Sequence, residues 1–386
     1  MSLIYLDNSA TTRADEQVVT AMNKYLLECY GNPSSLHRMG LEAEKAMNKA
    51  RKQVADFLKV DEKTITFVSG GTEGNNLAIR SAINKNKRLG NKIITSAIEH
   101  PSVLEGFKSY ESNGYDVFYI GVDKKGFLDL EQLEEVLDDK TILVSIMKVN
   151  NEVGSIQNTS EIAKIIKKKS PHCIFHSDCV QAVGKVPVEP LSEGIDILTF
   201  SGHKIHGPKG IGAIYVRKDL ALQPILFGGG QERGFRSGTE NLPGVVGIGV
   251  AVDQLSQFQQ QVDHLQELKS KAIELLKGEL SGIHFNSDES EKYAPHVLNI
   301  SIEDVKSEIL LHLLEKKEIF ISSGSACTSK KNSQSHVLKS MNLSNEYIEG
   351  SLRISFSKYN TLEEIEYMVK MLKESVDNVR KFTRRR

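Results

Sequence analysis

Short apolar runs alternate with stretches of helical periodicity from about residue 40 onward, and this alternation constrains the fold more than any other feature of the sequence. One helix-like stretch covers residues 161–169, where Thr159 and Ser160 are the expected N-caps. Strands that alternate with helices in this way predict an α/β fold with an open, mainly parallel sheet covered by helices on both faces. The apolar runs lie at residues 65–68, 92–97, 116–120, 141–147, 173–176, 195–201 and 212–216.

A second pattern begins with a long amphipathic helix at about residue 258. Strand-like and helical stretches follow it, and the last helix opens with an expected capping box at residues 361–364. A chain of 386 residues is long enough to bury two hydrophobic cores. We therefore predict a large domain at residues 15–257 and a smaller α/β domain formed by residues 1–14 and 258–386.

Composition narrows the classes of partner. The net charge is −1 with 26% charged residues, so no strong field favours nucleic acid or a membrane surface. No apolar run approaches the roughly 20 residues that span a bilayer, and the start of the chain lacks the features of a signal peptide. The four cysteines are scattered without a C-x-x-C pair, which disfavours a disulfide framework and a structural zinc site. We expect a cytoplasmic protein without a metal.

Residues whose side chains can bind ligands or take part in catalysis follow the apolar runs. Ligands of parallel α/β sheets bind beyond the carboxyl ends of the strands, so residues at these positions are expected to meet in one site. The residues in question lie at 69–73, 99–101, 150–152, 178 and 201–204.

Lys204 is the strongest single candidate. It follows a buried strand and stands beside Ser201 and His203. A buried amine loses its proton readily and can form a Schiff base with an aldehyde cofactor, while hydroxyl and imidazole groups can hold a phosphate. The cofactor implied is pyridoxal 5'-phosphate (PLP). Lys209 is the competing lysine, but it lies in a Gly-Pro-Lys-Gly turn, where a solvated side chain is the default.

Three further strand-end positions each have a functional and a structural interpretation. Gly71 and Thr72 lie in a glycine-rich turn before a helix, which suits a phosphate or is simply a tight turn. Asp178 can keep a pyridine nitrogen protonated or cap a helix. His100 can stack on a pyridine ring and move protons, although a lone histidine is more often structural.

Three features outside the strand ends complete the set. The glycine-rich stretch at residues 228–239 is either a solvent loop or a lid that carries groups into a neighbouring subunit's site. Cys327 lies in a small, polar segment where a thiolate nucleophile is plausible chemistry. Arg353 interrupts a strand pattern. If it faces inward, it needs an acidic partner and can bind a substrate carboxylate, and if it faces outward it is solvated.

Taken together, these segments resemble the cysteine desulfurases, which are PLP enzymes of the class V aminotransferase group. The similarity runs nearly end to end, and its Ser-Gly-Ser-Ala-Cys segment is similar to the branch with the longer cysteine loop. The resemblance implies fold type I, with a mainly parallel seven-stranded sheet in the large domain and the catalytic cysteine in the small one. The matching motifs are YLDNSATT (5–12), GNPSS (31–35), SGGTE (69–73), VNNEVG (149–154), SGHK (201–204), GGQER (229–233) and SGSAC (323–327).

The resemblance also implies a role for each matching residue. Lys204 would bind the cofactor and move protons, and Cys327 would attack the substrate sulfur. His100 would stack on the cofactor ring, Asp178 would pair with the ring nitrogen, and Gln181 would form a hydrogen bond to the ring hydroxyl. The residues that would bind the phosphate are Gly71, Thr72, Ser201, His203 and the other protomer's Thr239. The residues that would bind the substrate carboxylate are Asn8, Asn151 and Arg353.

The function implied is conversion of L-cysteine to L-alanine, with sulfur passing to Cys327 as a persulfide and then to an acceptor protein. That acceptor would be an iron–sulfur scaffold or a tRNA-thiolation enzyme, and the enzyme would be a homodimer. Direct nucleic-acid binding is not expected from the near-neutral charge. The alternatives are an aminotransferase, a selenocysteine lyase, or a sulfur-carrier scaffold with weak turnover. One departure from the family pattern is Gly74, where many relatives have serine.

Overall fold

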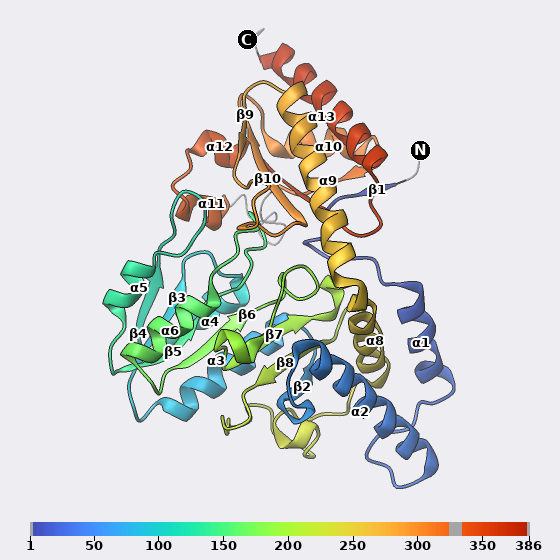
Figure 1. The fold of residues 1–386 in the computed structure, drawn as a ribbon, viewed down its shortest axis with the longest axis vertical. Coiled ribbons are helices and arrows are strands. Elements are labelled where there is room, and N and C mark those ends of the chain that lie inside the picture. The colour runs from blue at the N-terminus through green and yellow to red at the C-terminus, as the bar shows by residue number, and fades with distance from the viewer. Residues whose placement is uncertain (1–2, 324–333, 384–386) are drawn as a thin grey trace.

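The computed structural model describes residues 3–323 and 334–383. Its larger part is built on a seven-stranded sheet with the strand order β2-β8-β7-β6-β5-β3-β4 (Figure 1). β8 runs antiparallel to both of its neighbours, and the other paired strands of this sheet are parallel. The mainly parallel sheet predicted from the apolar runs is therefore confirmed. The strands are β2 (Ile65–Val68), β3 (Lys92–Ser96), β4 (Asp116–Ile120), β5 (Thr141–Ser145), β6 (Ile174–Asp178), β7 (Ile197–Ser201) and β8 (Gly212–Val216).

Helices cover both faces of this sheet because alternate residues of each strand point to opposite sides. On β7, Ile197 packs in the same core as Leu77 of α3, whereas the next residue, Leu198, packs in the core that contains Ile248 of α8. The helices of this part are α1 (Glu16–Leu27), α2 (Arg38–Leu58), α3 (Gly71–Asn86), α4 (Pro101–Glu111), α5 (Leu130–Val136), α6 (Thr159–Lys169), α7 (Pro190–Glu193) and α8 (Leu242–Asp253), with 3-10 turns η1 (Glu62–Thr64), η2 (Gly202–Lys204), η3 (Glu232–Gly234) and η4 (Gln254–Gln257).

The predicted N-caps of α6 were wrong. The helix already begins at Thr159, and its cap is Asn158, whose side-chain oxygen accepts a hydrogen bond from the Glu161 amide at 3.3 Å. Thr159 instead uses its hydroxyl to donate to the carboxylate of Glu193. Several adjacent polar residues can serve as caps, so a sequence pattern does not single out one of them.

A second hydrophobic core lies in the upper part of Figure 1. It joins Ile4 and Leu6 of the N-terminal segment to residues of the last third of the chain, such as Leu268, Ile300 and Leu372. The predicted domain boundaries stay a prediction. The elements are β1 (Ile4–Tyr5) paired with β11 (Ile319–Phe320), the antiparallel sheet of β9 (Ile283–Phe285), β10 (Val297–Ile302) and β12 (Ser351–Ser355), and the helices α9 (Phe258–Glu279), α10 (Ser307–Glu315), α11 (His336–Ser340), α12 (Asn345–Glu349) and α13 (Leu362–Thr383).

The capping box predicted for the last helix is present. The Thr361 hydroxyl accepts a hydrogen bond from the Glu364 amide at 3.3 Å, and the Glu364 carboxylate accepts one from the Thr361 amide at 3.3 Å. Within the described ranges, none of the helices combines the length and the apolar character that a bilayer crossing requires.

Candidate active site

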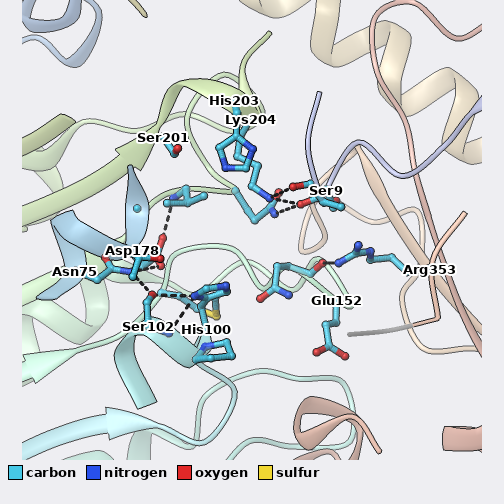
Figure 2. Close-up of a pocket in the computed structure, with 18 of the residues that line it drawn as sticks. Ser9, Asn75, His100, Ser102, Glu152, Asp178, Ser201, His203, Lys204 and Arg353 are labelled. Carbon is cyan, nitrogen blue, oxygen red and sulfur yellow. Dashed lines mark hydrogen bonds between the residues drawn. The ribbon is translucent and has the colours of Figure 1, made fainter. Parts of the chain in front are cut away.

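A cavity of about 320 Å³ opens at the carboxyl ends of β6 and β7 (Figure 2). Residues from the N-terminal segment, from the large sheet and from β12 meet around it, so it collects segments that are distant in the sequence. Its lining consists of Ser9, Ala10, Gly71, Thr72, Asn75, His100, Pro101, Ser102, Met147, Asn151, Glu152, Asp178, Val180, Gln181, Ser201, His203, Lys204, His336 and Arg353.

Lys204 enters the cavity from η2, the turn that directly follows β7. Its ammonium group donates hydrogen bonds to the backbone carbonyls of Ser9 and Ala10, the latter at 2.8 Å. The N-terminal segment therefore orients the lysine. His203 lies beside it, and its Nδ1 shares a hydrogen bond of 3.1 Å with the Thr11 hydroxyl. Burial, reinforced by the charge of Lys204, lowers the pKa of His203 to about 4, so this imidazole is neutral at physiological pH.

Asp178 is the last residue of β6 and is almost fully buried. Its Oδ1 accepts a hydrogen bond from the Val180 amide at 2.9 Å, and its Oδ2 accepts one from the Asn75 side chain at 2.7 Å. Both bonds stabilise the ionised carboxylate. The Asp178 carboxylate is therefore held in one orientation at this end of the cavity.

His100 caps α4 and is tied to Asp178 through two side chains. The second N–H of the Asn75 amide donates to the Ser102 hydroxyl at 2.9 Å, and that hydroxyl lies 2.8 Å from Nδ1 of His100. Nδ1 also accepts the Ser102 backbone N–H at 3.1 Å, so the neutral ring carries its proton on Nε2. Burial lowers the pKa of His100, with Lys204 and His336 adding to the effect while Asp178 opposes it.

Gly71 and Thr72 form the first turn of α3, at the same end of the sheet as Ser201. Free N–H groups at a helix start favour an anion, and the Thr72 hydroxyl can add a further hydrogen bond. A side chain at Gly74 would bring its Cβ within 2.4 Å of the Thr199 methyl group on β7. A side chain at position 74 would therefore require Thr199 to move.

Arg353 faces inward from β12, with 3% of its side chain exposed. Its Nη2 donates to the Asp7 carboxylate at 2.8 Å, and its Nη1 donates to the Asn151 carbonyl at 2.9 Å. The acidic partner that a buried arginine requires is therefore Asp7. Nε of Arg353 is buried without a partner.

The structure does not bring every candidate into this cavity. Asn8 turns its amide toward the carbonyls of Tyr5 and Ser355, at 3.1 and 2.9 Å, and is absent from the lining. Thr239 lies in a separate cavity of about 120 Å³ that also contains Arg236. Gln181 does line the site, where it donates to the Ser9 carbonyl at 2.9 Å. Cys327 lies outside the described residues.

Sequence reasoning missed several lining residues. Asn75 stands directly after the glycine-rich turn, but its bond to Asp178 spans 103 positions of the sequence and no local pattern announces it. His336 begins α11 and donates from Nε2 to the Glu99 carbonyl at 2.9 Å. Glu152, in contrast, lies in the stretch 150–152 that the sequence predicted at this end of the sheet. It accepts a hydrogen bond from the Ser335 hydroxyl at 2.5 Å, and burial raises its pKa.

The residues present fit PLP. A lysine amine matches the aldehyde, a fixed carboxylate matches a pyridine nitrogen, and a helix start with hydroxyl groups matches a phosphate. In Figure 2, Asp178 and Arg353 lie on opposite sides of the view, with Lys204 and His100 between them. Among the described residues, no group of three or more His, Cys, Asp or Glu side chains is arranged to hold a metal ion.

The chain is similar to known enzymes over nearly its full length. The family model "Aminotransferase class-V" matches residues 4–368. "Cysteine desulfurase" of Trichormus azollae is 44% identical over 383 residues, which cover 98% of this chain and 94% of the relative. "Cysteine desulfurase IscS" of Methanosarcina thermophila is 42% identical over 379 residues, covering 98% and 93%.

Solved structures of similar proteins superpose on nearly the whole chain. A "NifS-like protein" superposes with a TM-score of 0.92 at 38% identity, over 97% of this chain and 100% of that one. "SspA in complex with cysteine" superposes with a TM-score of 0.80 at 33% identity, over 93% and 100% of the two chains.

Proposed function

The chain belongs to the class-V aminotransferase family and is a PLP-dependent cysteine desulfurase, and we propose that the cavity around Lys204 is its active site. One observation carries this proposal. Asp178 is the last residue of β6 and Lys204 follows the neighbouring strand β7, and both line the cavity that also contains the buried Arg353. A lysine, a carboxylate and an arginine in one enclosed space match the aldehyde and ring nitrogen of the cofactor and the carboxylate of the substrate.

When bound, PLP supplies an electron sink for the electron pair left on the substrate Cα after a proton is removed. The residues of this chain hold the cofactor and control the protons. Asp178 would pair with the ring nitrogen, and the amine of Lys204 would bind the aldehyde. The other residues that would hold the cofactor are Gly71, Thr72, His100, Gln181, Ser201 and His203, with Thr239 from a second protomer.

The substrate is L-cysteine, and Arg353 with Asn151 would hold its carboxylate. Asn8, which the sequence assigned to the same task, is bonded to the carbonyls of Tyr5 and Ser355 instead. Nζ of Lys204 would take the proton from Cα and return it during turnover. The thiolate of Cys327 would form a bond to the substrate sulfur as the Cβ–S bond breaks. The sulfur then remains on Cys327 as a persulfide, the electron pair of the broken bond goes to the substrate carbon, and a proton completes L-alanine.

The persulfide of Cys327 would next pass to an acceptor protein, either an iron–sulfur scaffold or a thiolation enzyme, in the cytoplasm. A homodimer is supported by two observations. Thr239 lies away from the cavity of its own chain. Large apolar side chains are also exposed on and after α1 and near the glycine-rich loop; these are Leu26, Leu27, Tyr30, Leu36 and Phe227. A monomer in sedimentation equilibrium of the active enzyme would contradict this assembly.

The experiment that tests the sulfur step is Cys327→Ala. We expect this variant to keep its PLP absorbance and to lose persulfide formation and sulfide release from L-cysteine. Cys29→Ala is the matched control, because Cys29 is a partly exposed free cysteine that the proposal leaves without a role. Full turnover by Cys327→Ala would contradict the assignment of Cys327 without touching that of Lys204.

A further inference from the structure

Arg353 already has an anionic partner before any substrate binds. Its Nη2 donates to Oδ1 of Asp7 at 2.8 Å, and the two side chains are 3% and 19% exposed. Asp7 is not among the residues that line the cavity. It therefore contacts the guanidinium from outside the space that a substrate would occupy.

The three nitrogens of Arg353 are in different situations. Nη2 is bonded to Asp7, Nη1 is bonded to the Asn151 carbonyl at 2.9 Å, and Nε is buried without a partner. A guanidinium carries five N–H donors, so a second anion can be bound while the first one stays. Arg353 can therefore bind the Asp7 carboxylate and a ligand carboxylate at the same time.

Two like charges that share one cation repel each other, and burial makes this repulsion stronger than it is in water. Asp7 must therefore lower the affinity of Arg353 for any further carboxylate. It also compensates the arginine charge in the empty site, because an unpaired buried charge is strongly unfavourable.

We propose that Asp7 is a counter-charge that sets the affinity of the active site for amino-acid carboxylates. The inference rests on the proposed function, in which Arg353 holds the carboxylate of the substrate. L-cysteine and L-alanine carry the same carboxylate, so Asp7 weakens both and thereby allows the product to exchange for the next substrate.

Orientation of Arg353 does not depend on Asp7 alone. The backbone of Arg353 exchanges two hydrogen bonds with Ser322, at 2.7 and 3.1 Å, and Nη1 remains bonded to Asn151. Replacing Asp7 by asparagine keeps one oxygen acceptor for Nη2 and removes the negative charge, while the second carboxylate oxygen becomes an NH2 group. Asp7 is a positioning residue in this account, since it acts through Arg353.

The test is equilibrium titration of the holoenzyme with L-alanine and with cysteamine, followed by cofactor absorbance and by thermal unfolding. For Asp7→Asn we expect the Kd of L-alanine to fall roughly tenfold, the scale of a modest change in one ion pair, while the Kd of cysteamine, which has no carboxylate, stays the same. Without ligand, the variant should unfold at a lower temperature than the wild type. L-alanine should raise the unfolding temperature of the variant by more than it raises that of the wild type.

Asp15→Asn is the matched control, because the buried Asp15 also pairs with a cation, Lys358 at 2.7 Å, and lies outside this cavity. It should change stability and leave the Kd of L-alanine unchanged. If Asp7→Asn does not fold, Asp7→Ser carries the same test. An unchanged or higher Kd of L-alanine overturns the proposal, and so does an equal change for cysteamine. If Arg353→Met leaves L-alanine binding intact, the carboxylate site of the proposed function is wrong instead.

Discussion

Asn75 connects the two groups of the site whose protonation matters most. One N–H of its amide donates to Asp178 and the other to Ser102, whose hydroxyl lies next to His100. The amide thus stabilises the ionised form of the carboxylate and, through Ser102, the ring tautomer that has its proton on Nε2. A single buried residue therefore connects Asp178, through Ser102, to His100.

This role gives the first prediction. Asn75→Asp replaces a donor by a second negative charge beside Asp178, which disfavours the ionised form of that carboxylate. We expect the affinity of the apoenzyme for PLP to fall by about tenfold to a hundredfold, the scale of a lost hydrogen bond to a charged group. Spectrophotometric titration with PLP measures it. Asn86→Asp is the control, since Asn86 lies on the same helix and donates to His172, away from the cavity; equal effects in both variants would refute the role of Asn75.

Single residues were predictable where local context decides their chemistry. The preference for Lys204 over Lys209 follows from the strand that ends at residue 201, and Lys209 is indeed exposed. The inward direction of Arg353 was open, because strand alternation alone does not choose a face. Asp7 could not be named as its partner, since that ion pair joins positions 346 residues apart.

The contact between α3 and β7 limits the size of the side chain at position 74 in the first turn of α3. Gly74 lies in the first turn of α3, directly over Thr199 of β7, and a Cβ there would approach the threonine methyl group to 2.4 Å. Thr199 cannot simply be removed, because its hydroxyl shares a hydrogen bond of 3.2 Å with the buried His176. The two positions are therefore coupled.

Gly74→Ser should destabilise the protein by about 1–3 kcal/mol, the usual cost of overpacking a core. Thr199→Ser in the same chain removes the methyl group and keeps the hydroxyl, so the double variant should regain most of the loss. A double-mutant cycle in urea measures the coupling. Strictly additive effects of the two substitutions would show that the contact does not restrict the helix start.

Element positions were largely predictable, because each apolar run has a physical requirement to be buried. The strands of the large sheet fall within the predicted runs, except that β6 extends to Asp178, two residues beyond the run at 173–176. Helix ends were less predictable. At α6 three consecutive residues, 158–160, are of types that commonly cap helices, and the choice of Asn158 depends on where Thr159 finds a partner in the folded chain.

The N-terminal segment connects the two cores and the site at the scale of the whole molecule. Ile4 packs in the second core, Asp7 pairs with Arg353, and Ser9 and Ala10 receive the Lys204 ammonium group. Sequence patterns predicted that this segment completes the smaller domain. Its contacts with Lys204 could not be predicted, because they are made by backbone carbonyls, which no side-chain pattern encodes.

Buried histidines make the stability of the molecule depend on pH. Burial lowers the pKa of His176 and of His206 to about 3, whereas an unfolded histidine titrates near 6.5. Between these values the unfolded chain binds a proton that the folded chain does not, so stability rises with pH in this window and is lost toward acid. Each histidine should remove about 2 kcal/mol between pH 7 and pH 5.

His206→Asn tests this directly. Residue 206 has a φ of 61°, a region that asparagine tolerates. The variant should lose about 2 kcal/mol less than the wild type between pH 7 and pH 5, as measured by urea unfolding. The exposed His312, replaced in the same way, should leave the pH dependence unaltered. Identical slopes for His206→Asn and the wild type would contradict the expectation.

The most direct test of the account is to find the lysine that holds the cofactor. Borohydride reduction of the holoenzyme fixes PLP covalently to its lysine, and peptide mass spectrometry then identifies the residue. We predict that the pyridoxyl group is found on Lys204. Before reduction, the enzyme should form L-alanine from L-cysteine, and Lys204→Ala should form no L-alanine. A pyridoxyl group on Lys209 or on the buried Lys185 would contradict the assignment of the active site.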